Sequence, residues 1–245
     1  MDKRTLGLAG KHILVTGAHG YLGSYICSAL DEEIAVPYLI DKVGSEAREI
    51  DQVDITSSDS IEKYTNDLKE FFDVGKDVKF SGIINNAALN IKGVDLTPEQ
   101  FTKTLEANVT GAFNIINAFK PFLTDDASIV NVSSIYGMLS PNFDIYGGEP
   151  EQYSSSAYGA SKAAIAQMTR YYAVQLAPLR VNSVSPGGIF QNQQKKFVKL
   201  YSDRAPLKRM ADPEEIVNAI LFLLSPLSSY ITGHNLVVDG GLSIW

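Results

Sequence analysis

The stretch Val15–Gly23, VTGAHGYLG, decides the fold of this chain, because glycine recurs in it at every third position. The apolar run HILVTG leads into it, and a segment with helical periodicity, YLGSYICSAL, continues from it. Glycines between a buried strand and a helix let the backbone approach a pyrophosphate, and the N–H groups of the helix start favour its negative charge. The stretch therefore predicts a nucleotide-binding turn, although a tight turn without a ligand uses similar patterns.

The remaining apolar runs predict an α/β fold. They are short and alternate with longer stretches of helical period, as expected for strands that are buried on both faces of a parallel sheet. We predict a Rossmann-type, doubly wound parallel sheet in a three-layer α/β/α arrangement, with ligands beyond the carboxyl ends of the strands. The runs are HILVTG, IAVPYLID, FSGIINNAA, ASIVNVSS, LRVNSVSP and HNLVVDGG.

Composition excludes several classes of protein. The 245 residues are 45% hydrophobic, which suffices for one core, so we expect a single domain over residues 1–245. A net charge of −7 without a basic block argues against a nucleic-acid partner. The single cysteine, Cys27, forms no internal disulfide, and no segment has the roughly 20 apolar residues of a membrane span. We expect a cytoplasmic protein that does not contact membranes.

Two acids follow the second apolar run. Asp41 closes YLID and lies 18 positions after Gly23 (41 − 23), near the position where an acid binds the adenosine ribose. Such a carboxylate repels the 2′-phosphate of NADP, so we expect NAD as the cofactor. The nearby cations Lys42 and Arg48 leave NADP as an alternative. Asp54 suits either the adenine amino group or the N-cap of a following helix.

Tyr158 and Lys162, in AYGASKAA, lie one helical turn apart on the same face. A nearby ammonium favours the phenolate, which lowers the tyrosine pKa from about 10 toward the range of acid/base catalysis. Such a pair also occurs by chance on many helices.

In their order along essentially the whole chain, these motifs resemble the short-chain dehydrogenase/reductase family. The resemblance is carried by TGAHGYLG, NNAA, ANVTGAF, IVNVSS, YGASK, RVNSVSPGGI and DPEEIVNAILFLLSPLSSYITGHNLVVDGG. It implies a nicotinamide cofactor and a catalytic tetrad of Asn108, Ser134, Tyr158 and Lys162. Tyr158 would exchange a proton with the substrate oxygen that Ser134 also binds, Lys162 would bind the nicotinamide ribose, and Asn108 would hold a water linked to the lysine.

The turn, the two acids and the resemblance together predict the cofactor site, and no metal ligands are expected. The expected cofactor-binding residues are Gly17, His19, Gly20, Tyr21, Leu22, Asp41, Asp54, Ile55, Asn86, Ala87, Ala88, Tyr158, Lys162, Pro186, Gly187 and Ile189.

The glycine spacing departs from the compact branch of the family. Tyr21 stands where compact members have a glycine, and Gly20 gives the spacing of the extended branch, which contains nucleotide-sugar epimerases and dehydratases. The C-terminal VVDGG is typical of compact members. We favour the compact branch, because no residues remain for a larger substrate domain.

Two irregular stretches, Ile135–Tyr153 and Gly187–Met210, are expected to form lids or specificity loops, the second with a short helix. Gln191 replaces the threonine that usually follows PG in the family. The second stretch is basic, which suits either anion capture or a solvated face. Its charged residues are Lys195, Lys196, Lys199, Asp203, Arg204, Lys208 and Arg209.

The sequence thus predicts an NAD(H)-dependent oxidoreductase that interconverts a secondary alcohol and a ketone. The loop before Tyr158 is similar to that of family members from surface-polysaccharide pathways, which implies a sugar, sugar acid or nucleotide-linked sugar as substrate. The alternatives are an NAD-using epimerase or dehydratase and a cofactor-binding regulator without turnover. We also expect a homo-oligomer, a tetramer or dimer, paired through the helix that begins at AYGASK.

Overall fold

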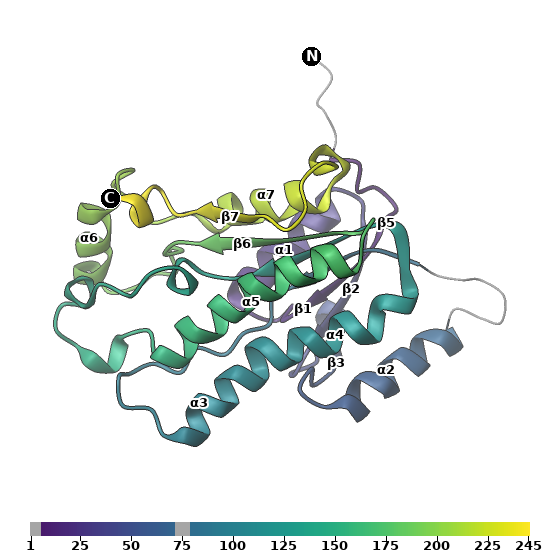
Figure 1. Cartoon of the computed structure of the whole chain (residues 1–245), viewed down its shortest axis with the longest axis horizontal. Coiled ribbons are helices and arrows are strands. Elements are labelled where there is room, and N and C mark those ends of the chain that lie inside the picture. Colours follow the sequence, from purple (N-terminus) through teal and green to yellow (C-terminus); the bar gives the residue numbers. More distant parts are fainter. Residues whose placement is uncertain (1–5, 72–78) are drawn as a thin grey trace, which may run out of the picture.

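The computed structural model describes residues 6–71 and 79–245, and a parallel sheet of seven strands forms its centre (Figure 1). The strand order is β3-β2-β1-β4-β5-β6-β7, so the direction of winding reverses between β1 and β4. A reversal of this kind opens a crevice at the carboxyl ends of the strands. The strands are β1 (His12–Thr16), β2 (Val36–Asp41), β3 (Ile50–Gln52), β4 (Phe80–Asn85), β5 (Leu123–Val132), β6 (Arg180–Pro186) and β7 (Asn235–Val238).

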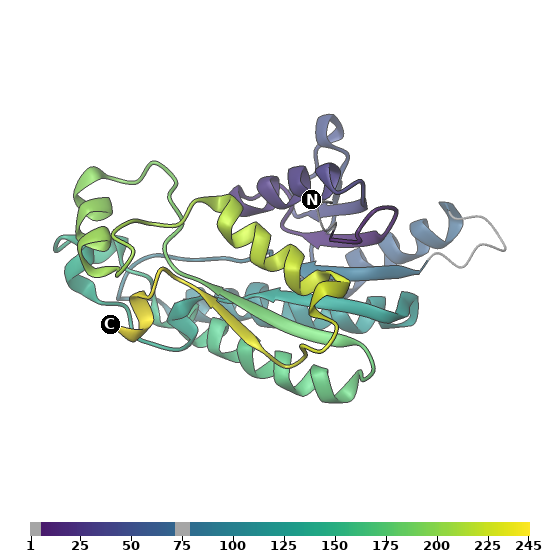
Figure 2. The same cartoon turned by 90° about the horizontal axis from the view of Figure 1, so that it is seen from above.

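Helices cover both faces of the sheet, as predicted. In Figure 2, α1 (purple) and α7 (yellow-green) lie on one side, and α4 (teal) and α5 (green) lie on the other. The helices are α1 (Tyr21–Glu32), α2 (Ser58–Phe71), α3 (Pro98–Leu105), α4 (Gly111–Phe119), α5 (Ser156–Gln175), α6 (Lys195–Arg204) and α7 (Pro213–Leu224).

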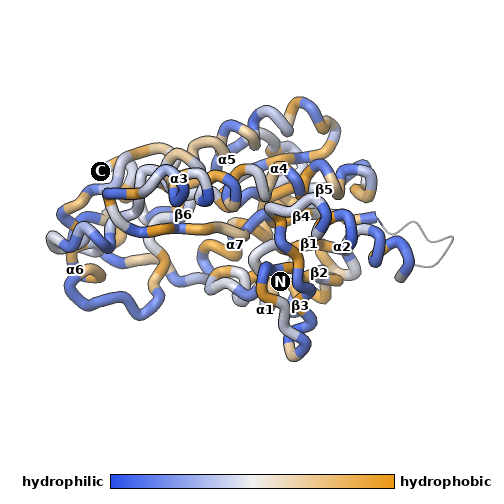
Figure 3. Tube along the Cα trace, turned by 90° about the horizontal axis from the view of Figure 1, so that it is seen from below, coloured by the Kyte–Doolittle hydropathy of each residue, from blue (hydrophilic) through white to orange (hydrophobic). Residues whose placement is uncertain are grey.

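Alternate residues of the strands feed the two cores. Ile13 and Val15 pack with α1 and α7, whereas Leu14 packs with α2, α4 and α5 on the opposite face. All three side chains are buried. This alternation explains why β1 is an unbroken apolar run, because neither of its faces meets water. Figure 3 shows the same contrast, with hydrophobic central strands and a mostly hydrophilic α2.

Two parts of the fold are not evident from the sequence pattern. The segment PEQFTKTLEANVTGAFNIINAF, which has helical periodicity, folds as α3 and α4 with a π-helical turn, Glu106–Thr110, between them. The polar stretch after Asp41 contains strand β3 and helix α2, which its sequence pattern does not indicate. Strand β3 has three residues, of which only Ile50 is buried, so it leaves almost no apolar pattern in the sequence.

No helix in residues 6–71 or 79–245 is both long enough and apolar enough to cross a bilayer.

Candidate active site

Two cavities lie at the carboxyl ends of the strands. The first cavity, of about 880 Å³, opens at the ends of β1, β2 and β4 and is lined by Gly17, Asp41 and Asn86, among others. The second cavity, of about 670 Å³, opens at the ends of β5 and β6 and is lined by Ser134 and Gly187, among others.

The first cavity collects most of the expected cofactor residues: Gly17, His19, Gly20, Tyr21, Leu22, Asp41, Asp54, Ile55, Asn86, Ala87 and Ala88. Of the others, Tyr158, Gly187 and Ile189 line the second cavity, while Pro186 and Lys162 are buried and line neither. Residues that sequence reasoning missed in the first cavity are Lys42, Val53, Thr56, Leu89, Lys103, Glu106 and Ala107. Four of these residues are next to predicted residues in the sequence: Lys42, Val53, Thr56 and Leu89. Lys103, Glu106 and Ala107 come from the α3–α4 region, and their place in the cavity depends on tertiary packing.

The floor of the first cavity is bare backbone. Gly17 has a φ of +69°, and a Cβ atom there would lie 2.6 Å from the Cα atom of Ala87. A Cβ on Gly23 would lie 2.1 Å from the carbonyl oxygen of Gly17. Asn86 donates from Nδ2 to the carbonyl oxygen of Gly17 at 2.9 Å, which fixes the turn against the end of β4. Only glycine fits at both positions, so the turn packs closely against the segment after β4 and the start of α1.

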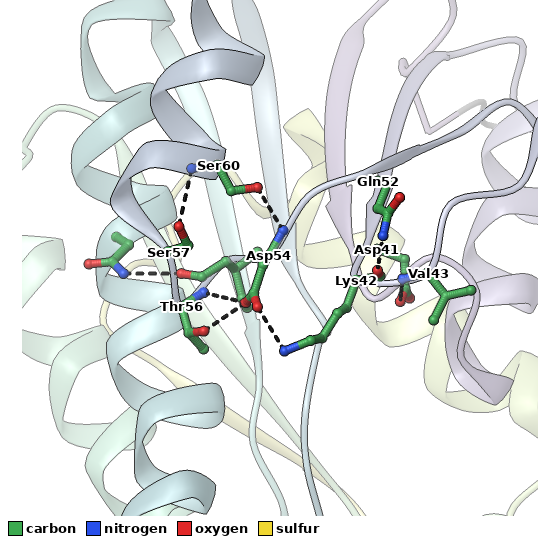
Figure 4. A network of polar contacts seen from close by, with 10 residues as sticks. Asp41, Lys42, Val43, Gln52, Asp54, Thr56, Ser57 and Ser60 are labelled. Carbon is green, nitrogen blue, oxygen red and sulfur yellow. Dashed lines mark hydrogen bonds and ion pairs between the residues drawn. The ribbon is translucent and has the colours of Figure 1, made fainter.

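Asp41 is oriented by the same turn. Its Oδ2 accepts a hydrogen bond from the backbone N–H of His19 at 3.1 Å. Its Oδ1 accepts one from the backbone N–H of Val43 at 3.1 Å (Figure 4). A carboxylate held at the end of β2 retains lone pairs that can accept from two adjacent hydroxyl groups. This arrangement suits a ribose in the first cavity.

Asp54 is engaged by its neighbours instead of capping α2. Its Oδ2 pairs with Lys42 Nζ at 2.7 Å, and its Oδ1 accepts from Thr56 (Figure 4). The hydrogen bond from Lys42 is the main reason that the pKa of Asp54 falls to about 2. The N-cap alternative for Asp54 is wrong, since Ser57 Oγ accepts from the N–H of Ser60 in the first turn of α2.

Tyr158 lies in the first turn of α5, where the cap residue Ser155 fixes the helix start by accepting from the N–H of Tyr158. Its side chain and that of Ser134, which follows β5, line the second cavity. Burial raises the pKa of the Tyr158 phenol, and a hydrogen bond with Ser134 opposes this rise. The expectation that the tyrosine pKa falls is therefore wrong for this structure, because desolvation of the phenolate outweighs the other effects.

Lys162 lies behind Tyr158, one turn along α5. Its Nζ donates to the carbonyl oxygen of Val132 at 2.7 Å and lies 5.7 Å from the centre of the Tyr158 ring. Burial lowers the pKa of Lys162 to about 8. The ammonium thus reaches the strand end that carries Ser134, and it titrates close to physiological pH.

Asn108 lies in the π-helical turn and is buried. Its Oδ1 accepts from the N–H of Leu89 at 2.6 Å, and its Nδ2 donates to the carbonyl oxygen of Leu89 and to Ser161 Oγ. Both amide N–H groups are thereby used to join the segment after β4 to α5. The water-holding role of Asn108 stays a prediction, and the side chain has a clear architectural role.

This chain is similar to known proteins over nearly its whole length. The family model described as enoyl-(acyl carrier protein) reductase matches residues 24–243. An NAD-dependent glycerol dehydrogenase of Listeria innocua is 31% identical, with 98% of this chain and 97% of the relative covered. A 3-oxoacyl-[acyl-carrier-protein] reductase of Thermotoga maritima is 32% identical, with 97% and 99% covered.

Two further comparisons carry the family name. An uncharacterized short-chain type dehydrogenase/reductase of Sinorhizobium fredii is 31% identical over 98% of this chain, which spans 45% of that relative. The crystal structure of a short chain dehydrogenase from Leptospira borgpetersenii, with bound NAD+, is 30% identical with a TM-score of 0.88, covering 100% of this chain and 97% of the other. This chain belongs to the short-chain dehydrogenase/reductase family.

In this dehydrogenase/reductase the two irregular stretches form one wall of the second cavity. Ile145 and Tyr146 from the first stretch pack with Tyr201 and Met210 from the second. The Tyr146 hydroxyl is 3.0 Å from that of Tyr136, within the cavity lining. The expected short helix is present as α6, and Gln191 also lines this cavity.

The basic residues of the second stretch divide into two groups. Lys199 pairs with Asp203 at 2.6 Å, Arg209 forms a two-pronged pair with Glu215, and Lys208 donates to the carbonyl oxygen of Asp203. These residues support the solvated alternative. Lys196, in contrast, lines the second cavity.

Proposed function

We propose that this oxidoreductase uses NAD(H) to interconvert a secondary alcohol and a ketone on a sugar, sugar acid or nucleotide-linked sugar. The observation that carries the proposal is that Ser134 and Tyr158 line one cavity, with the Lys162 ammonium buried directly behind the tyrosine. Two hydroxyl groups at one point can both bond the oxygen of a reacting carbonyl.

The first cavity fits a dinucleotide. Gly17 and Gly20 line it without side chains, and Asp41 presents a carboxylate where a ribose would lie. NAD, when bound, supplies the acceptor or donor of the hydride. The NAD-dependent relative and the NAD-bound structural neighbour support this cofactor. We favour NAD over NADP because the nearest cation, Lys42, is already paired with Asp54, and Asp41 repels a 2′-phosphate.

The residues of the second cavity account for the proton. Burial keeps the Tyr158 phenol protonated near neutral pH, so it is ready to donate a proton to a ketone oxygen. Ser134 donates a hydrogen bond to the same oxygen, which stabilises the charge that develops there. In the oxidative direction, the deprotonated Tyr158 receives the hydroxyl proton.

A hydroxyl-rich substrate is supported by the polar lining of the second cavity. Side-chain amides and hydroxyls can bond sugar hydroxyls through both donors and acceptors. The polar residues in question are Asn90, Gln152, Ser154, Gln191, Asn192, Gln193 and Gln194. A second candidate substrate is an acyl thioester with a 3-keto group. The similarity to a 3-oxoacyl-[acyl-carrier-protein] reductase supports this candidate.

The decisive assay incubates the protein with NAD or NADH and follows reduced-nicotinamide absorbance. The oxidation assay uses NAD with a panel of sugars, polyols and sugar acids. The reduction assay uses NADH with acetoacetyl thioesters. We expect NADH to form with at least one member of the sugar panel. Activity on the thioester alone would show that the substrate is an acyl thioester and not a sugar. Product formation on a nucleotide-linked sugar without net NADH would support the epimerase or dehydratase alternative, and no turnover anywhere would contradict the proposal.

We further propose that chains associate through α5. Tyr171 and Val174 of α5 are 63% and 81% exposed, and Phe113 of α4 is 50% exposed. Large apolar side chains gathered on adjoining helices are typical of a covered surface. A light-scattering mass of one 26.7 kDa chain would contradict this proposal.

A further inference from the structure

Lys92 is held in the wall of the second cavity by backbone pairing. The segment after β4 forms an antiparallel bridge between Lys92 and Ser154, and the N–H of Gly93 donates to the carbonyl oxygen of Tyr153 at 2.9 Å. Lys92 Nζ donates to Ser154 Oγ at 3.4 Å, beside the start of the helix that carries Tyr158. The pairing fixes the backbone from which this ammonium reaches the cavity.

Lys196 reaches the same cavity from the first turn of α6. Its Nζ donates to the carbonyl oxygen of Gly147 at 3.0 Å. Gly147 has a φ of +68°, and a Cβ there would lie 2.7 Å from Lys196 Cε. The glycine therefore gives the lysine stem room to lie across the loop, which places a second ammonium in the lining.

These two cations have only neutral partners within the described residues. Neither forms an ion pair there, whereas their neighbour Lys199 is paired with Asp203. Among the described residues that line the second cavity, Glu149 contributes the only carboxylate. The cavity therefore has an excess of positive charge, in a chain whose net charge is −7. Burial also lowers the pKa of Lys92, which shows that this ammonium is partly desolvated without a compensating carboxylate.

We propose that the substrate carries an anionic oxygen group, a carboxylate or a phosphate, which Lys92 and Lys196 bind while its reacting carbon lies at Tyr158. This inference rests on the proposed function and narrows its substrate class to acidic or phosphorylated sugars and polyols. Charge-assisted hydrogen bonds to an anion are roughly twice as strong as neutral ones. The amide-rich part of the lining is then left to bind the hydroxyl groups.

The test compares neutral and anionic members of matched sets. The probes are glucose, glucuronate and glucose 6-phosphate; galactose and galacturonate; and glycerol, glycerate and glycerol 3-phosphate. Turnover with NAD gives KM, and calorimetric titration of the NADH-bound protein gives Kd for probes that do not react. We expect an anionic member to have a KM or Kd at least about tenfold lower than its neutral counterpart in one or more sets. Equal or better binding of the neutral members in every set overturns the proposal.

Substitutions then assign the effect to the two lysines. Lys92→Met and Lys196→Met should each raise KM for the preferred anion by about tenfold, leave kcat within about threefold and change a neutral substrate by less than about twofold. Lys195→Met is the control, because it removes the adjacent charge on α6 from a residue outside the cavity lining. An equal effect of Lys195→Met, or an equal loss on neutral and anionic substrates, would show that the two lysines do not recognise an anion.

The proposed oxidoreductase function and the proposed anion site can fail separately. If NADH forms only with neutral sugars, the proposed function stands and this inference is wrong. If no probe is turned over but anionic probes bind in a manner that depends on Lys92 and Lys196, the anion site stands and the proposed function is wrong. The preference between glucuronate and glucose 6-phosphate distinguishes carboxylate from phosphate.

Discussion

The two cavities lie on different parts of the fold. The first is lined by the glycine turn and by residues at or near the carboxyl ends of β1, β2 and β4. The second is lined largely by residues of the two irregular stretches, whose aromatic rings pack on one another. Tyr146 in this lining contacts Phe197 and Tyr153, and Phe143, outside the lining, stacks on Tyr153 at 4.4 Å. A site at strand ends suits a ligand that many proteins share, whereas irregular stretches can be changed without altering the sheet.

The largest expected effect concerns the second cavity. Tyr158→Phe keeps the ring but removes the proton donor, so kcat should fall by about 1,000-fold while Kd for NADH stays within about twofold. Steady-state kinetics and fluorescence titration measure the two quantities. Tyr230→Phe, which alters a fully exposed tyrosine outside both cavity linings, is the matched control. Activity of Tyr158→Phe within about tenfold of wild type would remove the tyrosine from the reaction.

The corresponding change in the first cavity is Gly17→Ala. It adds a Cβ at a position with positive φ and only 2.6 Å from the Cα atom of Ala87, so NADH affinity should fall by about 100-fold or more. Gly10→Ala separates the two causes, since Gly10 has a φ of +68° but nothing within 4 Å of its Cβ position. Similar NADH affinity in both variants would show that the close approach to Ala87 is unimportant.

Lys162 makes the free energy of unfolding depend on pH. Its pKa is about 8 in the folded protein against an ordinary value of 10.5, so between these values the unfolded chain binds more protons and stability rises with pH. The full rise is on the order of 3 kcal/mol. We expect urea unfolding of wild type to show much of this rise between about pH 7.5 and about pH 9.5, below the range where Tyr158 titrates. Lys162→Met should lose most of this rise and keep only the opposing contributions of Lys92, whose pKa is lowered by burial, and Cys27, whose pKa is raised to about 11 by burial. A rise of equal size in the variant would assign it to other groups.

A smaller effect is expected at Asp41. Asp41→Ala removes an acceptor for ribose hydroxyls and the charge that repels a 2′-phosphate, so Kd for NAD should rise by about tenfold, with NADP unchanged or improved. Glu46→Ala removes an exposed acid from the loop after β2 and serves as the control. Titration of both cofactors measures the change. A native preference for NADP, or a uniform loss for both cofactors, would contradict the assignment.

The contrast between the cavities also explains what could be predicted from the sequence. Gly17 and Asp41 were found because a glycine turn and a strand end are local patterns, and local patterns fix where the backbone goes. Lys92 was missed because its place in the second cavity depends on a bridge to Ser154, far along the chain. Likewise, nothing in the basic stretch distinguishes Lys196 from Lys195, since only packing against Gly147 brings one of them into the lining.

Some expectations failed because burial is not visible locally. The Tyr158–Lys162 spacing predicted two side chains that lie near each other, but the direction of the tyrosine pKa follows from desolvation in the folded state. Likewise, the bonds that Asn108 in the π-helical turn forms with Leu89 and Ser161 join segments far apart in the sequence.

The most direct test that the two cavities bind different ligands is the NADH dissociation constant of a variant altered only in the aromatic residues Phe143 and Tyr146, which belong to the irregular stretch beside the second cavity. Phe143→Ala combined with Tyr146→Ala removes the ring that stacks on Tyr153 and the ring that contacts Phe197, and it alters no residue that lines the first cavity. Thermal melting checks that the sheet remains folded. The account predicts a Kd for NADH within about twofold of wild type, together with a loss of at least about tenfold in kcat/KM on the substrate that the panel identifies. A loss of NADH affinity equal to the loss of kcat/KM would contradict it, because the two cavities would then be one site.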